Sequence, residues 1–307
     1  MTESGKDDTH LCDITVLILT YNHAPYIAEA LRSVQNQTFP GSLEILIADD
    51  CSSDGTTDVA IQMVGNDPRV RLLDSSTNRG MQHNFRRALE QARGKYVALL
   101  EGDDYWVGNS KLSTLKHLLD NNTDYSAACH LTEVFVESTG ESLTFGHGFG
   151  GRHRIGFSDV MLGVFPHASS IVFHRSLLPT TPDWFDDLSA ADWAICGLLA
   201  AVGPVGVHRE IMSTYRKNAT SSWTPRPQLE RKLLHLQGLE AFAENVPQAK
   251  LVIQRPIATA HAVVAAVAIH DRRPVVAARH GAAYFRSDPL GAFKRILHRL
   301  SSMRSER

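Results

Sequence analysis

Residues 94–106 read GKYVALLEGDDYW, a largely apolar run that ends in a group of carboxylates. Strands that are buried on both faces read as continuous apolar runs, so this stretch predicts a strand inside a parallel sheet. Glu101, Asp103 and Asp104 then follow within four positions. Each ionised carboxylate disfavours ionisation of its neighbours, so the cluster needs a nearby cation or a partner that the fold supplies.

The same alternation of apolar runs and helical periodicity extends outward from this stretch. It predicts an α/β fold with a mainly parallel sheet that is sandwiched between helices. The expected strands cover residues 14–20, 43–50 and 70–75, and the expected helices cover residues 25–37, 52–64 and 81–94.

The regularity weakens after Lys111. We expect a helix over residues 111–122, strands over 124–138 and 168–178, a helix over 190–203 and a mobile glycine-rich loop over 139–156. From Pro225 onward the pattern is helical, and its last segment is basic and amphipathic. The sequence therefore predicts a catalytic domain over residues 1–224 and a helical extension over residues 225–307.

Composition excludes several classes of protein. The 307 residues carry 31 basic and 33 acidic side chains, which gives no overall electrostatic footprint for nucleic acid. The four cysteines are far apart in the sequence, which argues against a disulfide framework and a zinc site. Because no leader peptide or membrane-spanning run is recognisable, we expect a cytoplasmic protein.

Polar groups follow three of the expected strands, at Thr20–Asn22, at Asp49 and Asp50, and at Glu101–Asp104. Ligands of open parallel sheets bind beyond the carboxyl ends of the strands, so these groups would share one rim. No glycine-rich loop for phosphate follows any of these strands. Paired carboxylates that hold Mg²⁺ or Mn²⁺ would neutralise a diphosphate instead.

Four motifs in this order resemble the family 2 glycosyltransferases, which have the GT-A nucleotide-sugar-binding fold. They read ILTYNHAPYIAEALRSVQNQTF, EILIADDCSSDGT, NRGMQHNFRRALEQARGKYVALLEGDDYW and ADWAICGLLAAVGPVGVHREIMSTYR, and the likeness covers roughly residues 14–223. The resemblance implies transfer of a sugar from a nucleotide diphosphate to an acceptor hydroxyl or amine, with inversion at the anomeric carbon.

The resemblance also assigns the nucleotide-binding residues. Thr20 and Tyr21 would line the base pocket with Asn22 beside them. Asp50 would accept a hydrogen bond from the base, which is commonly uracil in this family. Arg79 would lie near the base or the phosphates.

Two acidic positions match the family's metal motif, with Asp104 as the expected ligand of Mn²⁺ or Mg²⁺. Asp103 would serve the ribose or a second coordination position. Asp192, in AADW, matches the catalytic base, although Ala191 replaces its usual acidic predecessor. A helix N-terminus favours the ionised carboxylate, which keeps Asp192 ready to accept a proton.

Histidine positions depart from the expected pattern. Many relatives carry Tyr-Arg-x-His at the positions where this chain has Tyr215 to Asn218, so Asn218 stands in place of the expected histidine. Arg216 or Lys217 could neutralise the phosphates in its place. Three other histidines, in or near the glycine-rich segment, lack metal-ligand spacing and would at most contact the acceptor; they are His147, His153 and His167.

Several alternatives stay open. A sugar nucleotidyltransferase would need a glycine-rich basic loop after the first strand, where this chain has TYNHAPY. A catalytically weak nucleotide-sugar binder, or a subunit beside an active partner, would also fit. The acceptor could be a glycan, a lipid-linked sugar or a small molecule. The basic C-terminal helices suit an anionic surface at the inner face of a membrane, a homodimer contact or packing on the catalytic domain.

Overall fold

The computed structural model describes residues 11–73, 75–146, 149–188, 191–218 and 226–287. The chain divides into two compact units. The first comprises residues 1–187 and 191–220, and the second comprises residues 188–190 and 221–307. The expected boundary between residues 224 and 225 lies outside the described residues.

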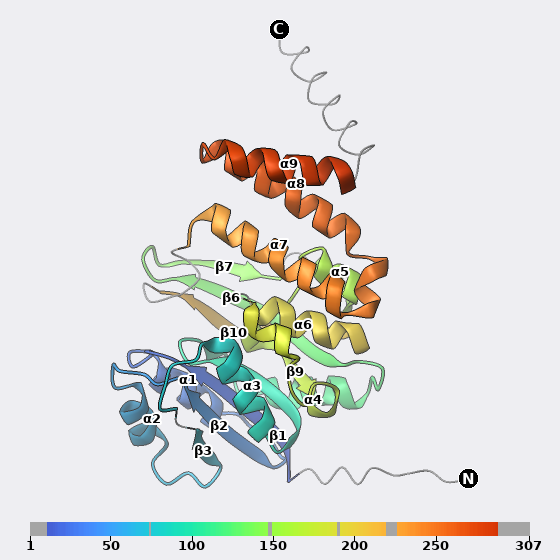
Figure 1. Cartoon of the computed structure of the whole chain (residues 1–307). Helices are drawn as coiled ribbons and strands as arrows, with labels where there is room; N and C mark the ends of the chain where they lie inside the picture. Colours follow the sequence, from blue (N-terminus) through green and yellow to red (C-terminus); the bar gives the residue numbers. More distant parts are fainter. Residues whose placement is uncertain (1–10, 74, 147–148, 189–190, 219–225, 288–307) are drawn as a thin grey trace, which may run out of the picture. The chain divides into compact units, whose positions relative to one another are not determined.

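Four parallel strands form the first half of the sheet, in the order β3-β2-β1-β4 (Figure 1). They are β1 (Cys12–Thr20), β2 (Leu43–Asp49), β3 (Val70–Leu73) and β4 (Gly94–Glu101). The connections between them contain α1 (Ile27–Gln35), α2 (Thr56–Val64) and α3 (Met81–Gln91). The expected α/β architecture with parallel strands is confirmed here.

The second half of the sheet is mixed. β9 (Val172–His174) lies antiparallel between β4 and β6 (Ala127–Val136), and β10 (Val205–Lys217) continues the sheet parallel to β6. The remaining elements are β5 (Tyr105–Trp106), β7 (Glu141–Phe145), β8 (Arg154–Ile155), α4 (Lys111–Asp120), α5 (Phe157–Met161) and α6 (Ala191–Val202).

The glycine-rich segment is more ordered than the sequence predicts. A loop was expected over residues 139–156, but β7 pairs antiparallel with β6 and β8 pairs antiparallel with β10. Gly140 has a φ of 71°, which lets the chain reverse tightly after β6. The polar residues of ESLTF and the glycines on either side of it conceal a strand that only its pairing with β6 defines.

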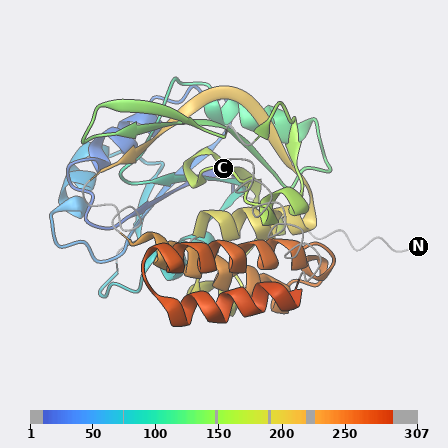
Figure 2. The ribbon, with the colours of Figure 1, turned by 90° about the horizontal axis from the view of Figure 1, so that it is seen from above.

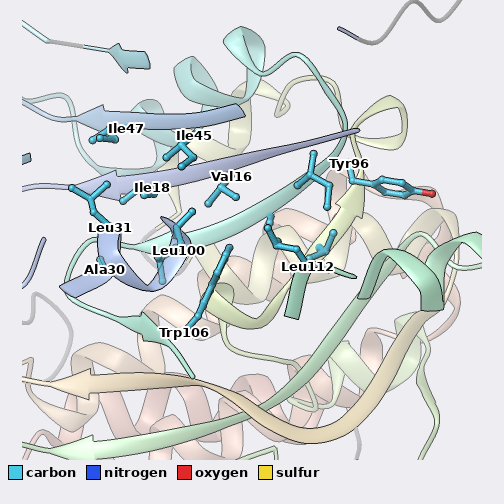
Figure 3. Packing of buried hydrophobic residues seen from close by; sticks show 14 of the residues in the cluster. Val16, Ile18, Ala30, Leu31, Ile45, Ile47, Tyr96, Leu100, Trp106 and Leu112 are labelled. Carbon is cyan, nitrogen blue, oxygen red and sulfur yellow. The ribbon is translucent and has the colours of Figure 1, made fainter. Parts of the chain in front are cut away.

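The core of the first unit packs aliphatic side chains of the sheet against a helix (Figure 3). Val16 and Ile18 of β1 and Ile45 of β2 are fully buried, as is Leu31 of α1. Burial of one such side chain is worth roughly 1.5–3 kcal/mol. This packing fixes the strand ends, which form the rim described below.

The second unit is helical in its described part. It contains α7 (Gln228–Asn245), α8 (Gln254–His270) and α9 (Pro274–Ser287), and α8 and α9 run side by side (Figure 2). Arg272, with a φ of 55°, lies in the turn that joins α8 to α9. Of the helices in the described ranges, none combines the length and apolarity needed to cross a membrane.

Candidate active site

The carboxyl ends of β1, β2 and β4 form one rim. Thr20 pairs with Asp49 across β1 and β2, and Leu19 pairs with Glu101 across β1 and β4. A Cβ atom on Gly102 would lie 2.7 Å from the Thr20 hydroxyl oxygen. Only glycine therefore allows β4 to approach β1 this closely, and the polar groups at the three strand ends meet as predicted.

The acidic cluster at the end of β4 is largely buried. Asp104 has no exposed surface, and its carboxylate accepts hydrogen bonds from the Ser169 hydroxyl at 2.6 Å and from the Arg216 amide at 2.9 Å. Burial raises the pKa of Glu101 and of Asp104 well above the ordinary range, and neighbouring carboxylates raise both further. A bound cation would relieve this repulsion.

His167 completes a set of three groups that could hold a metal ion. Its Nδ1 lies 3.6 Å from Asp104 Oδ2, and its Nε2 lies 3.9 Å from Glu101 Oε2. One ligand atom from each of the three residues lies within 4.8 Å of the others. Two carboxylates and one imidazole suit a divalent ion such as Mn²⁺. The metal-ligating spacing that the sequence lacks at His167 is created by the fold.

Ser169 contacts all three members of this set. Its hydroxyl donates to Asp104 and accepts from the Glu101 amide at 3.2 Å, and its own amide donates to His167 Nδ1 at 3.3 Å. Its carbonyl accepts hydrogen bonds from the buried Lys111 Nζ and from Trp106 Nε1. Ser169 therefore links the acidic cluster to the core beneath it.

Asp103 faces a different set of partners. Its Oδ2 accepts a hydrogen bond from Asn218 Nδ2 at 3.0 Å and lies 3.8 Å from His23 Nε2. His23 Nδ1 and the Thr20 hydroxyl are buried without a hydrogen-bond partner among the described residues. Unsatisfied buried polar atoms are costly, so a ligand group at this end of the rim would fit them.

Arg216 is engaged by the protein itself. Its guanidinium contacts Glu29 at 2.6 Å and Glu137 at 3.6 Å, and its Nε donates to the Asp103 carbonyl. Its charge is therefore already compensated by two carboxylates. This arrangement favours a structural role over the phosphate-neutralising role that the sequence left open.

Asp50 holds the loop that precedes α3. Its carboxylate accepts hydrogen bonds from the Arg79 amide at 3.0 Å and the Gly80 amide at 2.8 Å. Arg79 is exposed, as is Tyr21. Asn22 adopts a φ of 54° and accepts from the Ser53 amide. Thus Thr20 ends β1, Tyr21 and Asn22 follow it, Asp50 follows β2, and Arg79 lies between β3 and α3; the side chains of Tyr21 and Arg79 are exposed.

Asp192 occupies the first turn of α6. The neighbouring Trp193 is buried and donates its Nε1 hydrogen to the Val160 carbonyl at 2.9 Å, which anchors the start of the helix. Burial is the largest cause that raises the pKa of Glu101, and the charge of Asp192 is the second largest. Asp192 therefore acts electrostatically on the acidic cluster although it lies far from it in the sequence.

Residues 15–178 match the Glycosyl transferase family 2. The chain belongs to this family. An uncharacterised protein of Mycobacterium tuberculosis is 29% identical over 73% of this family 2 chain, which spans 64% of that relative's length. The GalNAc(5)-diNAcBac-PP-undecaprenol beta-1,3-glucosyltransferase of Campylobacter jejuni is 30% identical over 54% of this chain and 52% of its own.

The fold is also similar to that of solved glycosyltransferases. The mannosyltransferase PcManGT from Pyrobaculum calidifontis, in complex with GDP-Man and Mn²⁺, aligns with a TM-score of 0.63 at 20% identity. The alignment covers 96% of this chain and 81% of PcManGT. The expected GT-A fold is thereby confirmed.

Sequence reasoning missed several residues of the rim. It left His23, Ser169 and Lys111 unassigned and did not place His167 beside the acidic cluster. His23 could have been found, because it follows Asn22 within the first motif. Ser169 and Lys111 carry no such signal, since their partners are distant in the sequence and meet them only in the folded chain.

Proposed function

We propose that the protein is a metal-assisted, inverting glycosyltransferase that uses a nucleotide-diphosphate sugar, with a UDP-linked sugar as the expected donor. The observation that carries this proposal is the largely buried set of Glu101 and Asp104 at the end of β4 with His167 beside them. The named activities of the relatives and the GDP-Man and Mn²⁺ complex of the structural neighbour support it.

Asp104 and Glu101 would hold a divalent ion, with His167 beside them. The ion would supply Lewis-acid neutralisation of the diphosphate. Because His167 Nδ1 accepts a hydrogen bond from the Ser169 amide, the ring proton belongs on Nε2, which faces Glu101. From Nε2, His167 can donate to Glu101 or to a ligand oxygen, so in this tautomer the carboxylates of Asp104 and Glu101 would ligate the ion and His167 would position them. Asp103 would bind the ribose or a second coordination position.

The nucleotide would lie over the ends of β1 and β2. Tyr21 would contact the base, beside Thr20 and Asn22. Asp50 keeps further acceptor capacity beyond the two amides that it already binds, since an ionised carboxylate offers about four acceptor sites. By fixing the backbone of Arg79, Asp50 would also aim that guanidinium at the base or phosphates.

Asp192 would act as the general base. It takes the proton of the acceptor hydroxyl or amine while that atom bonds to the anomeric carbon, and the bond from that carbon to the diphosphate oxygen breaks. The electron pair leaves with the nucleoside diphosphate, and the configuration inverts. Among the described residues no group donates a hydrogen bond to the Asp192 carboxylate, which leaves it available as a proton acceptor.

Thermal melting with nucleotides tests the donor site. UDP, GDP, CDP and dTDP are each added with and without Mn²⁺. A ligand at about 100 times its dissociation constant stabilises a fold by roughly 2.7 kcal/mol, which shifts the melting curve visibly. We expect a Mn²⁺-dependent shift that is largest with UDP. If the shift with GDP were larger, the donor would be a GDP-linked sugar and not a UDP-linked one. No shift with any of the four would overturn the proposed donor site.

A catalytically weak binder is the second candidate. Asn218, which contacts Asp103, stands where the resemblance leads us to expect histidine. Turnover separates the two functions, because a binder would show the nucleotide shift but release no nucleoside diphosphate from a UDP-sugar in the presence of acceptor. We propose a lipid-linked sugar as the first acceptor to test, because the name of the Campylobacter relative contains an undecaprenol-linked sugar.

A further inference from the structure

The two parts of the chain carry opposite charge. Residues 226–307 contain 14 lysines and arginines against 6 aspartates and glutamates, whereas residues 1–225 contain 17 against 27. The near-neutral total therefore hides a strongly basic C-terminal segment. Such charge asymmetry between two parts of one chain indicates a partner with a negative surface.

The outer face of α9 combines this charge with exposed apolar side chains. Val275 is 81% exposed and Phe285 is 45% exposed. Six of the eight exposed positions of α9 lie along one face of the helix at 3.6 residues per turn; they are residues 275, 278, 279, 282, 285 and 286. Two of them are Arg279 and Arg286.

The neighbouring helix and turn extend the same character. Ile269, near the end of α8, is 69% exposed, and Arg272 and Arg273 in the turn are exposed as well. The opposite side of α9 is internal, because His280 is buried and its Nδ1 lies 2.9 Å from Nδ1 of His261 on α8. The end of α8, the turn and the outer face of α9 therefore all carry exposed apolar or basic side chains, and Asp271 is the one acidic residue of positions 254–287.

We propose that this face binds the surface of an anionic phospholipid bilayer. The aliphatic and aromatic side chains would enter the interfacial layer while the arginines contact the lipid phosphates, which is how amphipathic helices lie in a membrane plane. The proposal does not depend on sugar transfer, because it concerns α8 and α9 alone.

Other partners match this face less well. A second copy of the same face would bring like charges together, so self-association is opposed. Nucleic acid would attract the arginines, but Val275, Ile269 and Phe285 would gain nothing from a phosphate backbone. A bilayer is the partner that satisfies the charged and the apolar groups at once.

Cosedimentation of the full chain with vesicles tests the proposal. Vesicles of phosphatidylcholine with about one third phosphatidylglycerol are compared with pure phosphatidylcholine. We expect binding to the anionic vesicles, weaker binding in 0.5 M salt, and little binding to the neutral ones. An arginine near an anionic surface contributes roughly 1 kcal/mol, so the double variant Arg279→Gln with Arg286→Gln should lower the partition coefficient about thirtyfold.

A second variant tests the apolar contribution. Val275→Ser with Phe285→Ser should also release the protein from anionic vesicles, whereas matched controls in the first unit, Arg154→Gln and Ile61→Ser, should bind normally. Both control side chains are exposed. Circular dichroism checks that each variant keeps its helices.

Three outcomes would overturn the proposal. They are equal binding to neutral and anionic vesicles, binding that neither double variant weakens, and failure to bind any vesicle. In the last case, a gel shift with DNA or a dimer detected by light scattering, lost in the arginine variant, would assign the face to that other partner.

Discussion

The rim of the sheet and the outer face of α9 both gather charged groups of one sign in the described part of the chain, but they do so in opposite ways. The rim buries carboxylates whose pKa is raised by burial and mutual repulsion, whereas α9 exposes arginines beside apolar side chains. A buried charge that lacks a partner is expensive, so the rim demands a specific ligand. An exposed charge destabilises the fold little, so α9 does not require a ligand. Its affinity for a partner would be the sum of several weak contacts.

The strongest test of this contrast is Asp192→Asn. Loss of a positioned general base costs about 10²- to 10⁴-fold in rate, so we expect kcat to fall in that range. Donor binding, followed by the UDP-dependent melting shift, should stay within about twofold. Near-normal transfer by the variant would remove Asp192 from the mechanism.

Asp104→Asn should separate metal binding from folding. The amide keeps the shape of the side chain and removes one buried charge, so we expect the metal-free variant to melt no lower than the parent protein. The Mn²⁺-dependent shift should disappear. A shift of unchanged size would mean that the ion binds elsewhere, and Asp103→Asn would then be the variant to compare.

Ser169→Ala should weaken the same site indirectly. Loss of groups that orient metal ligands typically costs 10- to 100-fold in metal affinity or activity, and we expect the Mn²⁺ concentration for half-maximal transfer to rise in that range. Ser169→Thr retains the hydroxyl and should recover most of the loss. Equal defects in both variants would indicate a packing role rather than positioning of the carboxylates.

The His261–His280 contact predicts a smaller, pH-dependent effect in the C-terminal unit. Burial, together with the nearby Arg279, lowers the pKa of both histidines, Arg286 also lowers that of His261, and Glu240 opposes the shift at His280. Their contribution to stability is therefore complete above the unfolded pKa near 6.5 and is lost as the pH falls through the lower folded values.

Hydrogen exchange of residues 254–287 measures this effect. Protection, corrected for intrinsic exchange rates, should decrease between pH 7.5 and pH 5.5. In His280→Gln the decrease should be smaller. Protection that is independent of pH in the parent protein would contradict this account.

The smallest effect is expected for Val275→Ser with Phe285→Ser on transfer to a water-soluble acceptor. Because both side chains are exposed on α9, we expect kcat/KM to change by less than about twofold. A large loss would mean that this face supports the active site directly, and the contrast between the two regions would fail.

Much of the first unit could be predicted from the sequence. The parallel strands follow from continuous apolar runs, and the polar residues after them were placed correctly on one rim. β7 was missed because it is short and largely polar and lies in a glycine-rich segment, and its pairing with β6 is a property of the folded chain. The roles of Asp103, Asp104 and Asp192 remain predictions that the variants above test.

The sequence by itself determined the alternation of strands and helices over residues 14–101 and the acidic residues after β4, because these depend on residues close together in the chain. Only the tertiary structure decided that Ser169 forms hydrogen bonds with Glu101, Asp104 and His167. It also decided that the Arg216 guanidinium forms ion pairs with Glu29 and Glu137. Local periodicity specifies which side chain faces the core or the solvent. It carries no information about which distant side chain will meet it there, since that depends on how whole elements pack.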